Sequence, residues 1–110
     1  MEPMVFVYTT YASVVEAEKA GRVLVERRLA ACVNILPGMI SIYRWEGALE
    51  RGEEAVMIVK TRATLADAVS VAIKENHAYA TPAILTIPLG KVEAGYLAWM
   101  LEATQPAEAS

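Results

Sequence analysis

Three stretches of this chain are apolar at successive positions, and this feature limits its possible folds more than any other. They are Val5-Phe6-Val7, Val56-Met57-Ile58 and Ile84-Leu85 with Ile87, all rich in residues that favour strands. Because successive residues of a strand point to opposite faces, each stretch places apolar side chains on both sides of a sheet. Such a sheet has to be covered on both faces.

The patterns between these stretches indicate strands and helices in the order β-α-β-β-α-β, followed by a terminal helix. Ser13 and Glu16 have the spacing of a capping box, which predicts a helix that runs to about Arg28. Thr64 and Asp67 are expected to open a second helix that ends near Asn76. We expect strands at residues 4–10, 29–45 with a bend at Pro37-Gly38, 54–61 and 83–89, a turn within 47–52, a loop at 79–82 and a last helix at 91–103.

This order predicts an α+β fold of the ferredoxin-like type, with one antiparallel four-stranded sheet and a long hairpin between its second and third strands. Residues 1–104 are expected to form a single domain, and residues 105–110 a short polar tail. Right-handed crossovers would place the two main helices on one face of the sheet, and the last helix would shield a portion of the other. With 55% hydrophobic residues, the chain is predicted to cover its second face by forming a closed homo-oligomer.

Charge and cysteine content narrow the classes of partner. The net charge of −3 and the pI of about 5.1, with both signs interspersed, argue against nucleic acid and anionic membrane as partners. The lone Cys32 cannot form a disulfide within the chain, and the N-terminus shows no signal-peptide pattern. No apolar run approaches the roughly 18 residues of a membrane span. We therefore expect a soluble, cytoplasmic protein.

Cys32 and His77 are the candidate metal ligands, each the single residue of its type. In an oligomer they could join groups of a neighbouring subunit and hold copper or another divalent cation, which folding would not require. The alternative for Cys32 is a small buried hydrophobic residue in a strand. The alternative for His77 is an imidazolium at the negative end of the second helix.

A small-ligand cleft is expected where the strands end and the loops begin. Its candidate residues are Tyr43, Trp45, Lys60, Thr61, His77 and Tyr79, which combine aromatic walls with polar groups suited to a small anion. Packing between subunits is an equally good explanation for these aromatic residues. The charges from Arg44 to Glu54 are expected to be solvated or paired between subunits, and Tyr96, Trp99 and Met100 to belong to the core. A single histidine that nothing orients gives no catalytic triad.

Several segments closely resemble the CutA family of divalent-cation tolerance proteins. They are Leu29-Ala30-Ala31-Cys32-Val33-Asn34-Ile35, Ser41-Ile42-Tyr43-Arg44-Trp45-Glu46-Gly47, Ile58-Val59-Lys60-Thr61-Arg62, His77-Ala78-Tyr79 with Pro82 and Ile84, and Tyr96-Leu97-Ala98-Trp99. The resemblance implies a ferredoxin-like homotrimer with a PII-like arrangement, a role in tolerance to copper and other divalent ions, and no established catalytic activity.

This chain departs from the family pattern around its histidine. Ala78 stands where the family usually has proline, and Ala80 and Ala83 stand where it usually has glutamates. Without those carboxylates, a metal or ligand site there is expected to be weaker or altered. The predicted function is a trimeric, non-catalytic protein of divalent-cation (copper) tolerance that acts by binding a metal or small ligand or by signalling. The alternatives are a PII-like regulator that binds a small anion or nucleotide between subunits and contacts a partner protein, and a minor hydrolase.

Overall fold

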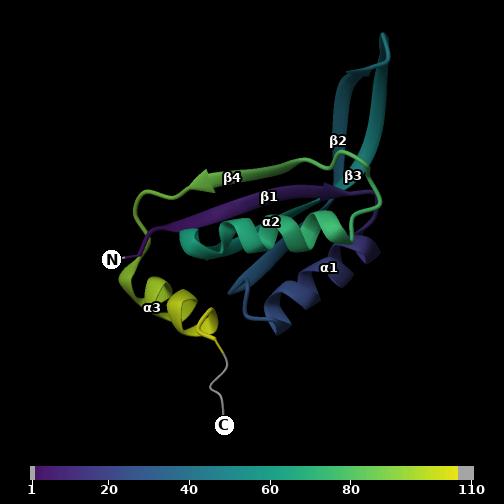
Figure 1. Ribbon diagram of the computed structural model, residues 1–110. Helices are drawn as coiled ribbons and strands as arrows, with labels where there is room; N and C mark the ends of the chain where they lie inside the picture. The colour runs from purple at the N-terminus through teal and green to yellow at the C-terminus, as the bar shows by residue number, and fades with distance from the viewer. Residues whose placement is uncertain (1, 107–110) are drawn as a thin grey trace.

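The computed structural model describes residues 2–106 and confirms the predicted order of elements (Figure 1). The four strands form one antiparallel sheet in the order β2-β3-β1-β4, so the two apolar strands β1 and β3 are central. The elements are β1 (Met4–Tyr11), α1 (Val14–Glu26), β2 (Cys32–Trp45), β3 (Ala48–Arg62), a 3-10 turn (Ala63–Leu65), α2 (Ala66–Glu75), β4 (Ile84–Pro88) and α3 (Ala94–Ala103). Most of the predicted polar tail, 107–110, lies outside the described residues.

The hairpin between β2 and β3 is longer than the sequence patterns predict. β3 begins at Ala48 rather than near residue 54, because the turn consists of Glu46 and Gly47 alone. Both residues have positive φ, 48° and 81°, and a two-residue turn of this kind matches the twist of the paired strands. The predicted turn within 47–52 is therefore wrong, and these residues are mostly strand.

The helix starts show where local capping was predicted correctly and where it was not. Ser13 caps α1, and its hydroxyl accepts a hydrogen bond from the Glu16 amide at 3.2 Å, as the capping box predicts. Thr64 does not cap α2, because its hydroxyl donates to the Glu2 carboxylate instead. Glu93 caps α3, which starts later than predicted. Within residues 2–106, no helix combines the length and apolar character needed to span a membrane.

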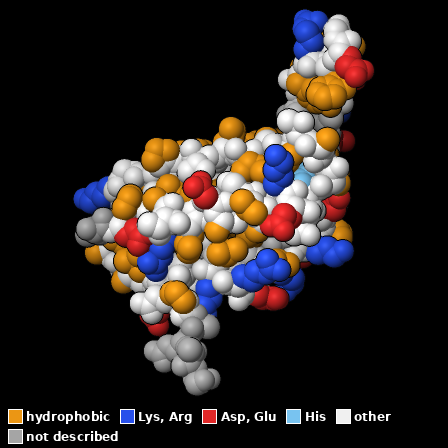
Figure 2. Space-filling model, in the orientation of Figure 1, with side chains coloured by type: hydrophobic (Ala, Val, Ile, Leu, Met, Phe, Trp, Pro, Cys, Tyr) orange, Lys and Arg blue, Asp and Glu red, His pale blue; other side chains and the backbone are white. Residues whose placement is uncertain are grey.

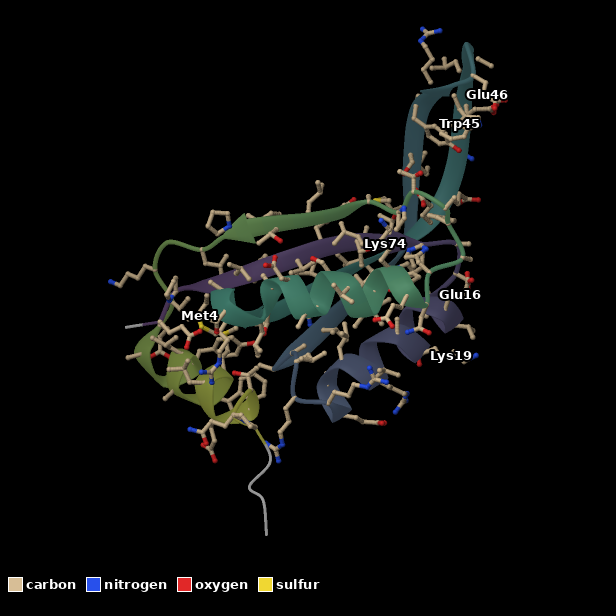
Figure 3. All side chains as sticks on the ribbon, in the orientation of Figure 1. Met4, Glu16, Lys19, Trp45, Glu46 and Lys74 are labelled. Atoms are coloured by element: carbon tan, nitrogen blue, oxygen red, sulfur yellow. The ribbon has the colours of Figure 1, made fainter. Side chains whose placement is uncertain are left out.

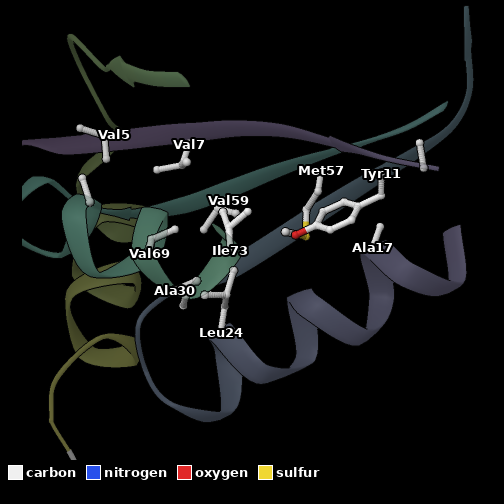
Figure 4. Packing of buried hydrophobic residues seen from close by; sticks show 13 residues of the cluster. Val5, Val7, Tyr11, Ala17, Leu24, Ala30, Met57, Val59, Val69 and Ile73 are labelled. Carbon is white, nitrogen blue, oxygen red and sulfur yellow. The ribbon is translucent and has the colours of Figure 1, made fainter. Parts of the chain in front are cut away.

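The main core lies between the sheet and the helices α1 and α2. Val7, Met57 and Val59 from the strands pack against Leu24 and Ile73 from the helices (Figure 4). These five side chains are at most 2% exposed, and their positions follow the alternation of each strand and the turn of each helix. One face of the sheet is thus covered by α1 and α2.

Gly21 allows α1 to approach the sheet closely. A Cβ atom at this position would lie 2.7 Å from Cγ2 of Val33 and 3.3 Å from the sulfur of Met57. Both distances are shorter than an ordinary van der Waals contact, and the branched Val33 side chain has few ways to move. The distance between helix and sheet therefore depends on this glycine.

The opposite face of the sheet, which we call the open face, is also apolar and carries neither α1 nor α2. Leu36, Leu85 and Ile87 point to this face and are 53%, 55% and 44% exposed. α3 covers the end of the sheet, where Met100 is buried with Met4. The core prediction is right for Met100 but wrong for Tyr96 and Trp99, which are 39% and 46% exposed.

Beyond the sheet, residues 39–54 form a projecting hairpin arm. The pairing of β1 with β3 ends at Tyr11 and Ala55, so no other strand within the described residues pairs with the arm. The radius of gyration of 15.0 Å exceeds the value of about 13 Å expected for a compact domain of this length. Ile42, Trp45 and Leu49 are exposed along the arm, which carries hydrophobic side chains far from the core (Figure 2).

Arg62 at the end of β3 ties three segments together. Its guanidinium donates to the Glu2 carboxylate at 3.0 Å, to the Thr104 hydroxyl at 2.9 Å and to the Leu101 carbonyl at 2.5 Å. These bonds join the N-terminal segment and the C-terminal end of α3 to the sheet. A lysine ammonium cannot reproduce this planar set of donors.

We predict that Gly21→Ala destabilises the protein by about 1–2 kcal/mol, because overpacking outweighs the gain of about 1 kcal/mol in helix propensity. Urea unfolding at fixed protein concentration measures the change. In a Val33→Ala background the clash is relieved, so the same substitution should become neutral or stabilising. Equal effects in both backgrounds would contradict the proposed contact.

We predict that Arg62→Lys lowers the free energy of unfolding by about 1–3 kcal/mol, since hydrogen bonds from a charged donor are lost at half-buried acceptors. Arg51→Lys on the exposed arm is the matched control and should change stability by less than about 0.5 kcal/mol. Thermal and urea unfolding of both variants test this. An Arg62→Lys variant as stable as the control would show that the three bonds contribute little.

Candidate functional site

A groove of about 820 Å³ lies at the root of the hairpin arm. It is bounded by the arm, by the open-face side of β1 and by the loop that precedes β4, and the labelled Trp45 marks its outer end in Figure 3. We call it the hairpin-root groove. Its lining residues are Tyr8, Thr10, Ala12, Met39, Ser41, Ile42, Tyr43, Trp45, Gly52, Glu53, Glu54, Tyr79, Ala80, Thr81 and Ala83.

The Glu54 carboxylate is the polar centre of the groove. Its two oxygens accept hydrogen bonds from the Ser41 hydroxyl and from the Tyr79 hydroxyl, each at 2.8 Å. Beside it, the Tyr8 hydroxyl donates to the thioether sulfur of Met39 at 3.4 Å. The groove therefore combines a fixed carboxylate with phenol oxygens and one soft sulfur atom.

The hydrogen bonds around Glu54 determine its charge. Burial raises its pKa, but hydrogen bonds from Ser41, Tyr79 and Thr10 outweigh this, so that the pKa lies below the ordinary 4.5. Burial and the bond to Glu54 raise the pKa of Tyr79 to about 12. At neutral pH the pair is thus a carboxylate held by a protonated phenol.

His77 holds the loop that carries Tyr79. Its Nδ1 accepts a hydrogen bond from the Tyr79 amide at 3.1 Å, which leaves Nε2 as the protonated nitrogen that donates to the Thr10 carbonyl at 2.7 Å. The ring also stacks on Tyr11, with centroids 4.4 Å apart and planes inclined by 13°. Its ring bonds run to β1 and the loop rather than to the last carbonyls of α2, and both nitrogens are engaged within one subunit.

Cys32 lies on the open face, away from His77. It is paired in register with Lys60, and the Asn34 amide approaches its sulfur at 3.7 Å. Lys60 is in turn opposite Phe6, four positions along β1 from the Thr10 carbonyl that binds His77, a separation of about 13 Å along the strand. One subunit therefore does not bring the two predicted metal ligands together.

The six residues predicted for the cleft are distributed over several places. The hairpin-root groove is lined by Tyr43, Trp45 and Tyr79. His77 does not line the groove but accepts a hydrogen bond from the Tyr79 amide. The remaining two, Lys60 and Thr61, do not line it. The Lys60 ammonium donates to the Tyr96 hydroxyl at 3.2 Å, and the fully buried Thr61 donates to the Leu29 carbonyl at 2.6 Å.

Glu54 is the main residue that the sequence patterns miss, because it was expected to be a solvated charge of the hairpin or to pair with a charge of another subunit. It is half-buried, and the register opposes it to Met39 after an irregularity between Leu36 and Met39. If the turn is placed at Glu46 and Gly47 rather than within 47–52, counting back along both strands gives the pairing of Met39 with Glu54.

The charge of the groove favours cations. Among residues 2–106, Glu53 and Glu54 are the only charged residues that line it, and no lysine or arginine does. Ala80 and Ala83 form part of its wall, so the two positions where the family resemblance would place glutamates are apolar here. In the part of the chain that the structure describes, no three His, Cys, Asp or Glu side chains are grouped as a metal site would require.

Comparison with known proteins gives one consistent result. Residues 5–103 match the family model described as CutA1 divalent ion tolerance protein. The divalent-cation tolerance protein CutA of Thermus thermophilus is 38% identical over 94% of this chain and 99% of its own length, and that of Archaeoglobus fulgidus is 41% identical over 91% and 97%. The chloroplastic protein CutA 1 of rice is 35% identical, but this chain spans only 58% of its length.

Solved structures show the same relationship. The CutA1 structure from Ehrlichia chaffeensis superposes with a TM-score of 0.92 at 30% identity and covers 96% of this chain, which in turn covers 98% of that structure. The structure of the periplasmic divalent cation tolerance protein CutA from Archaeoglobus fulgidus gives a TM-score of 0.90 at 40% identity, covering 93% and 99%. Sequence and fold agree over nearly all of the described residues. The chain therefore belongs to the CutA1 family of divalent ion tolerance proteins.

Proposed function

We propose that this chain acts as a homotrimeric, non-catalytic binding protein in divalent-cation tolerance, with the hairpin-root groove as its cation-binding surface. The observation that carries the proposal is the fixed Glu54 carboxylate in a groove without basic side chains. The names of the similar CutA proteins, which refer to divalent-cation tolerance, agree with a cation as the ligand.

The trimer is supported by surfaces that one subunit leaves uncovered. The open face exposes Leu85 and Ile87, and the arm exposes Ile42, Trp45 and Leu49. Closed symmetry lets each subunit offer its arm to one neighbour and its open face to the shared interior. The arm would then bring groups of one subunit to the groove of another.

The cation would take ligands from more than one subunit. One chain offers the Glu54 carboxylate, phenol oxygens and the Met39 thioether, which is fewer strong ligands than a closed transition-metal site needs. Cys32 and His77 would contribute a soft copper site if a neighbour's groups reach them. We do not expect folding to require a metal, since the main core is built from apolar side chains of the sheet and of α1 and α2.

The proposal also includes a cellular location. We place the protein in the cytoplasm, where the free thiol of Cys32 stays reduced.

The alternative function is a PII-like regulator that binds a small anion or nucleotide between subunits and contacts a partner protein. Lys60 favours this alternative, because its ammonium lies on the open face, 5.3 Å from the centre of the Tyr96 ring.

We predict that sedimentation at micromolar concentration finds a trimer, and that Leu85→Glu with Ile87→Glu produces smaller, less stable species. Charges on the open face would have to be desolvated in the assembly. Val71→Glu is the matched control, since Val71 is 59% exposed on α2, which lies on the other side of the sheet. A stably folded monomer of the unaltered chain would refute the trimer.

We predict that calorimetric titration of the demetallated oligomer detects binding of Zn(II) or Cu(II), and that Glu54→Gln weakens it at least tenfold. Glu50→Gln, on the arm but outside the groove, should leave it unchanged. Because the pKa of Glu54 is lowered, binding should persist to about pH 4.5 and be lost as the pH falls through that pKa and the carboxylate is protonated. Cys32→Ser should affect Cu(I) alone. Equal affinities of Glu54→Gln and the unaltered protein would exclude the groove as the cation site.

A further inference from the structure

The hairpin-root groove has aromatic side chains from three separate segments. Tyr8 comes from β1, Tyr43 and Trp45 come from the arm, and Tyr79 comes from the loop that precedes β4. The volume of about 820 Å³ is that of a site for an organic molecule and far exceeds the space that a bare metal ion fills. Size and lining therefore point to a ligand larger than an ion.

The arm contributes one face of its two strands to this groove. On β2 the lining includes four alternate residues, Met39, Ser41, Tyr43 and Trp45. On β3 a Cβ atom at Gly52 would lie 4.0 Å from the Tyr43 hydroxyl. Gly52 and Glu54 are alternate residues of β3, so the hydroxyl end of this ring lies on the same face of the arm as the Glu54 carboxylate.

The charge of the groove selects a cation. Glu54 is half-buried and Glu53 is exposed, and no lysine or arginine of residues 2–106 lines the groove. The one ion pair found among these residues joins Arg62 to Glu2, so neither lining carboxylate is neutralised by a cation of its own subunit. Aromatic faces beside carboxylates attract positive charge as well, because the ring quadrupole is negative on its face.

The hydrogen bonds of Glu54 favour a diffuse charge over a small one. Its two oxygens already accept bonds from the Ser41 and Tyr79 hydroxyls, each at 2.8 Å. A metal ion has to share these oxygens with the two donors. A quaternary ammonium group spreads its charge over its methyl groups and has no hydrogen to donate, so it needs only to lie beside the carboxylate and against aromatic faces.

We propose that the hairpin-root groove binds a quaternary ammonium compound. The charged head lies beside Glu54, and Tyr43 and Trp45 supply the aromatic faces. Ala80 and Ala83 give the groove an apolar wall for the rest of the molecule. This inference rests on the proposed function, since it extends the cation groove to an organic cation that relies on the same carboxylate. Metal ion and organic cation would compete for it.

The first experiment titrates the demetallated full-length protein, in the presence of a chelator, with choline and with its uncharged isostere 3,3-dimethylbutan-1-ol. Calorimetry measures both affinities. We expect saturable binding of choline, and binding of the alcohol weaker by about tenfold or more, because the alcohol has the same shape without the charge. No saturation with choline, or equal binding of the alcohol, would overturn the proposal.

Variants of the arm test the aromatic faces. Tyr43→Leu with Trp45→Leu should weaken choline binding by about tenfold, whereas Tyr43→Phe with Trp45→Phe keeps two aromatic faces and should weaken it less than about threefold. Neither ring belongs to the main core, so both double variants are expected to fold. Equal losses in the leucine and phenylalanine variants would contradict a role for the aromatic faces.

A fluorescence titration places the ligand in the groove. The chain has two tryptophans, so Trp99→Leu leaves Trp45 as the single one and removes an exposed aromatic side chain that does not line the groove. This variant should bind choline as the unaltered protein does, with a saturable change in Trp45 fluorescence. Loss of binding, or binding without a fluorescence change, would show that choline lies elsewhere and would overturn the assignment.

Charge variants and a metal titration separate this inference from the proposed function. Glu54→Gln should weaken choline binding by about tenfold, and Glu26→Gln on α1, on the other side of the sheet, should leave it unchanged. The same samples are titrated with Zn(II) without the chelator. Zn(II) binding without choline binding would overturn this inference and leave the proposed function standing. Choline binding without metal binding would support this inference and remove the metal ion from the groove.

Discussion

Two helices cannot cover both faces of a four-stranded sheet, and both faces of this sheet are apolar. α1 and α2 bury Val7, Met57 and Val59 on one side, while Leu85 and Ile87 stay exposed on the other. Apolar side chains grouped on an exposed face of this kind mark a surface at which burial against another molecule would be favourable. The CutA1 structure from Ehrlichia chaffeensis shares this arrangement of elements, so the placement of α1 and α2 on one face of the sheet is a property of the fold.

The arm follows from a second local constraint. Glu46 and Gly47 both take positive φ, and the tight turn they form extends β3 back to Ala48. The irregularity between Leu36 and Met39, where Gly38 also has positive φ, sets the register of the arm. This register brings Met39 opposite Glu54 and places Ser41 within reach of its carboxylate. The groove is thus produced by backbone conformation at two points.

Periodicity in the sequence was sufficient to predict the order of elements, the central position of the first strand and both main helices. Of the residues predicted for the cleft, Tyr43, Trp45 and Tyr79 line one groove. Lys60 and Thr61 were grouped with them, although these neighbours in a strand point to opposite faces. Glu54 was missed because its partners, Ser41 and Tyr79, are distant in the sequence. Strand pairing and loop placement across the sheet decide such contacts, and no local pattern encodes them. The metal role of Cys32 and His77, and the trimer itself, stay predictions.

The loop between α2 and β4 connects the two sides of β1. His77 binds the Thr10 carbonyl and the Tyr79 amide, Tyr79 binds Glu54, and Tyr11 stacks on the imidazole ring. None of these contacts involves the side chains of Ala78, Ala80 or Ala83, so the departures from the family pattern remove carboxylates without removing the framework that positions the loop. The loop is held by the contacts of His77 and Tyr79, and the charges around the hairpin-root groove would then determine which ligands it favours. The charged side chains among the described residues that line this groove are the carboxylates of Glu53 and Glu54.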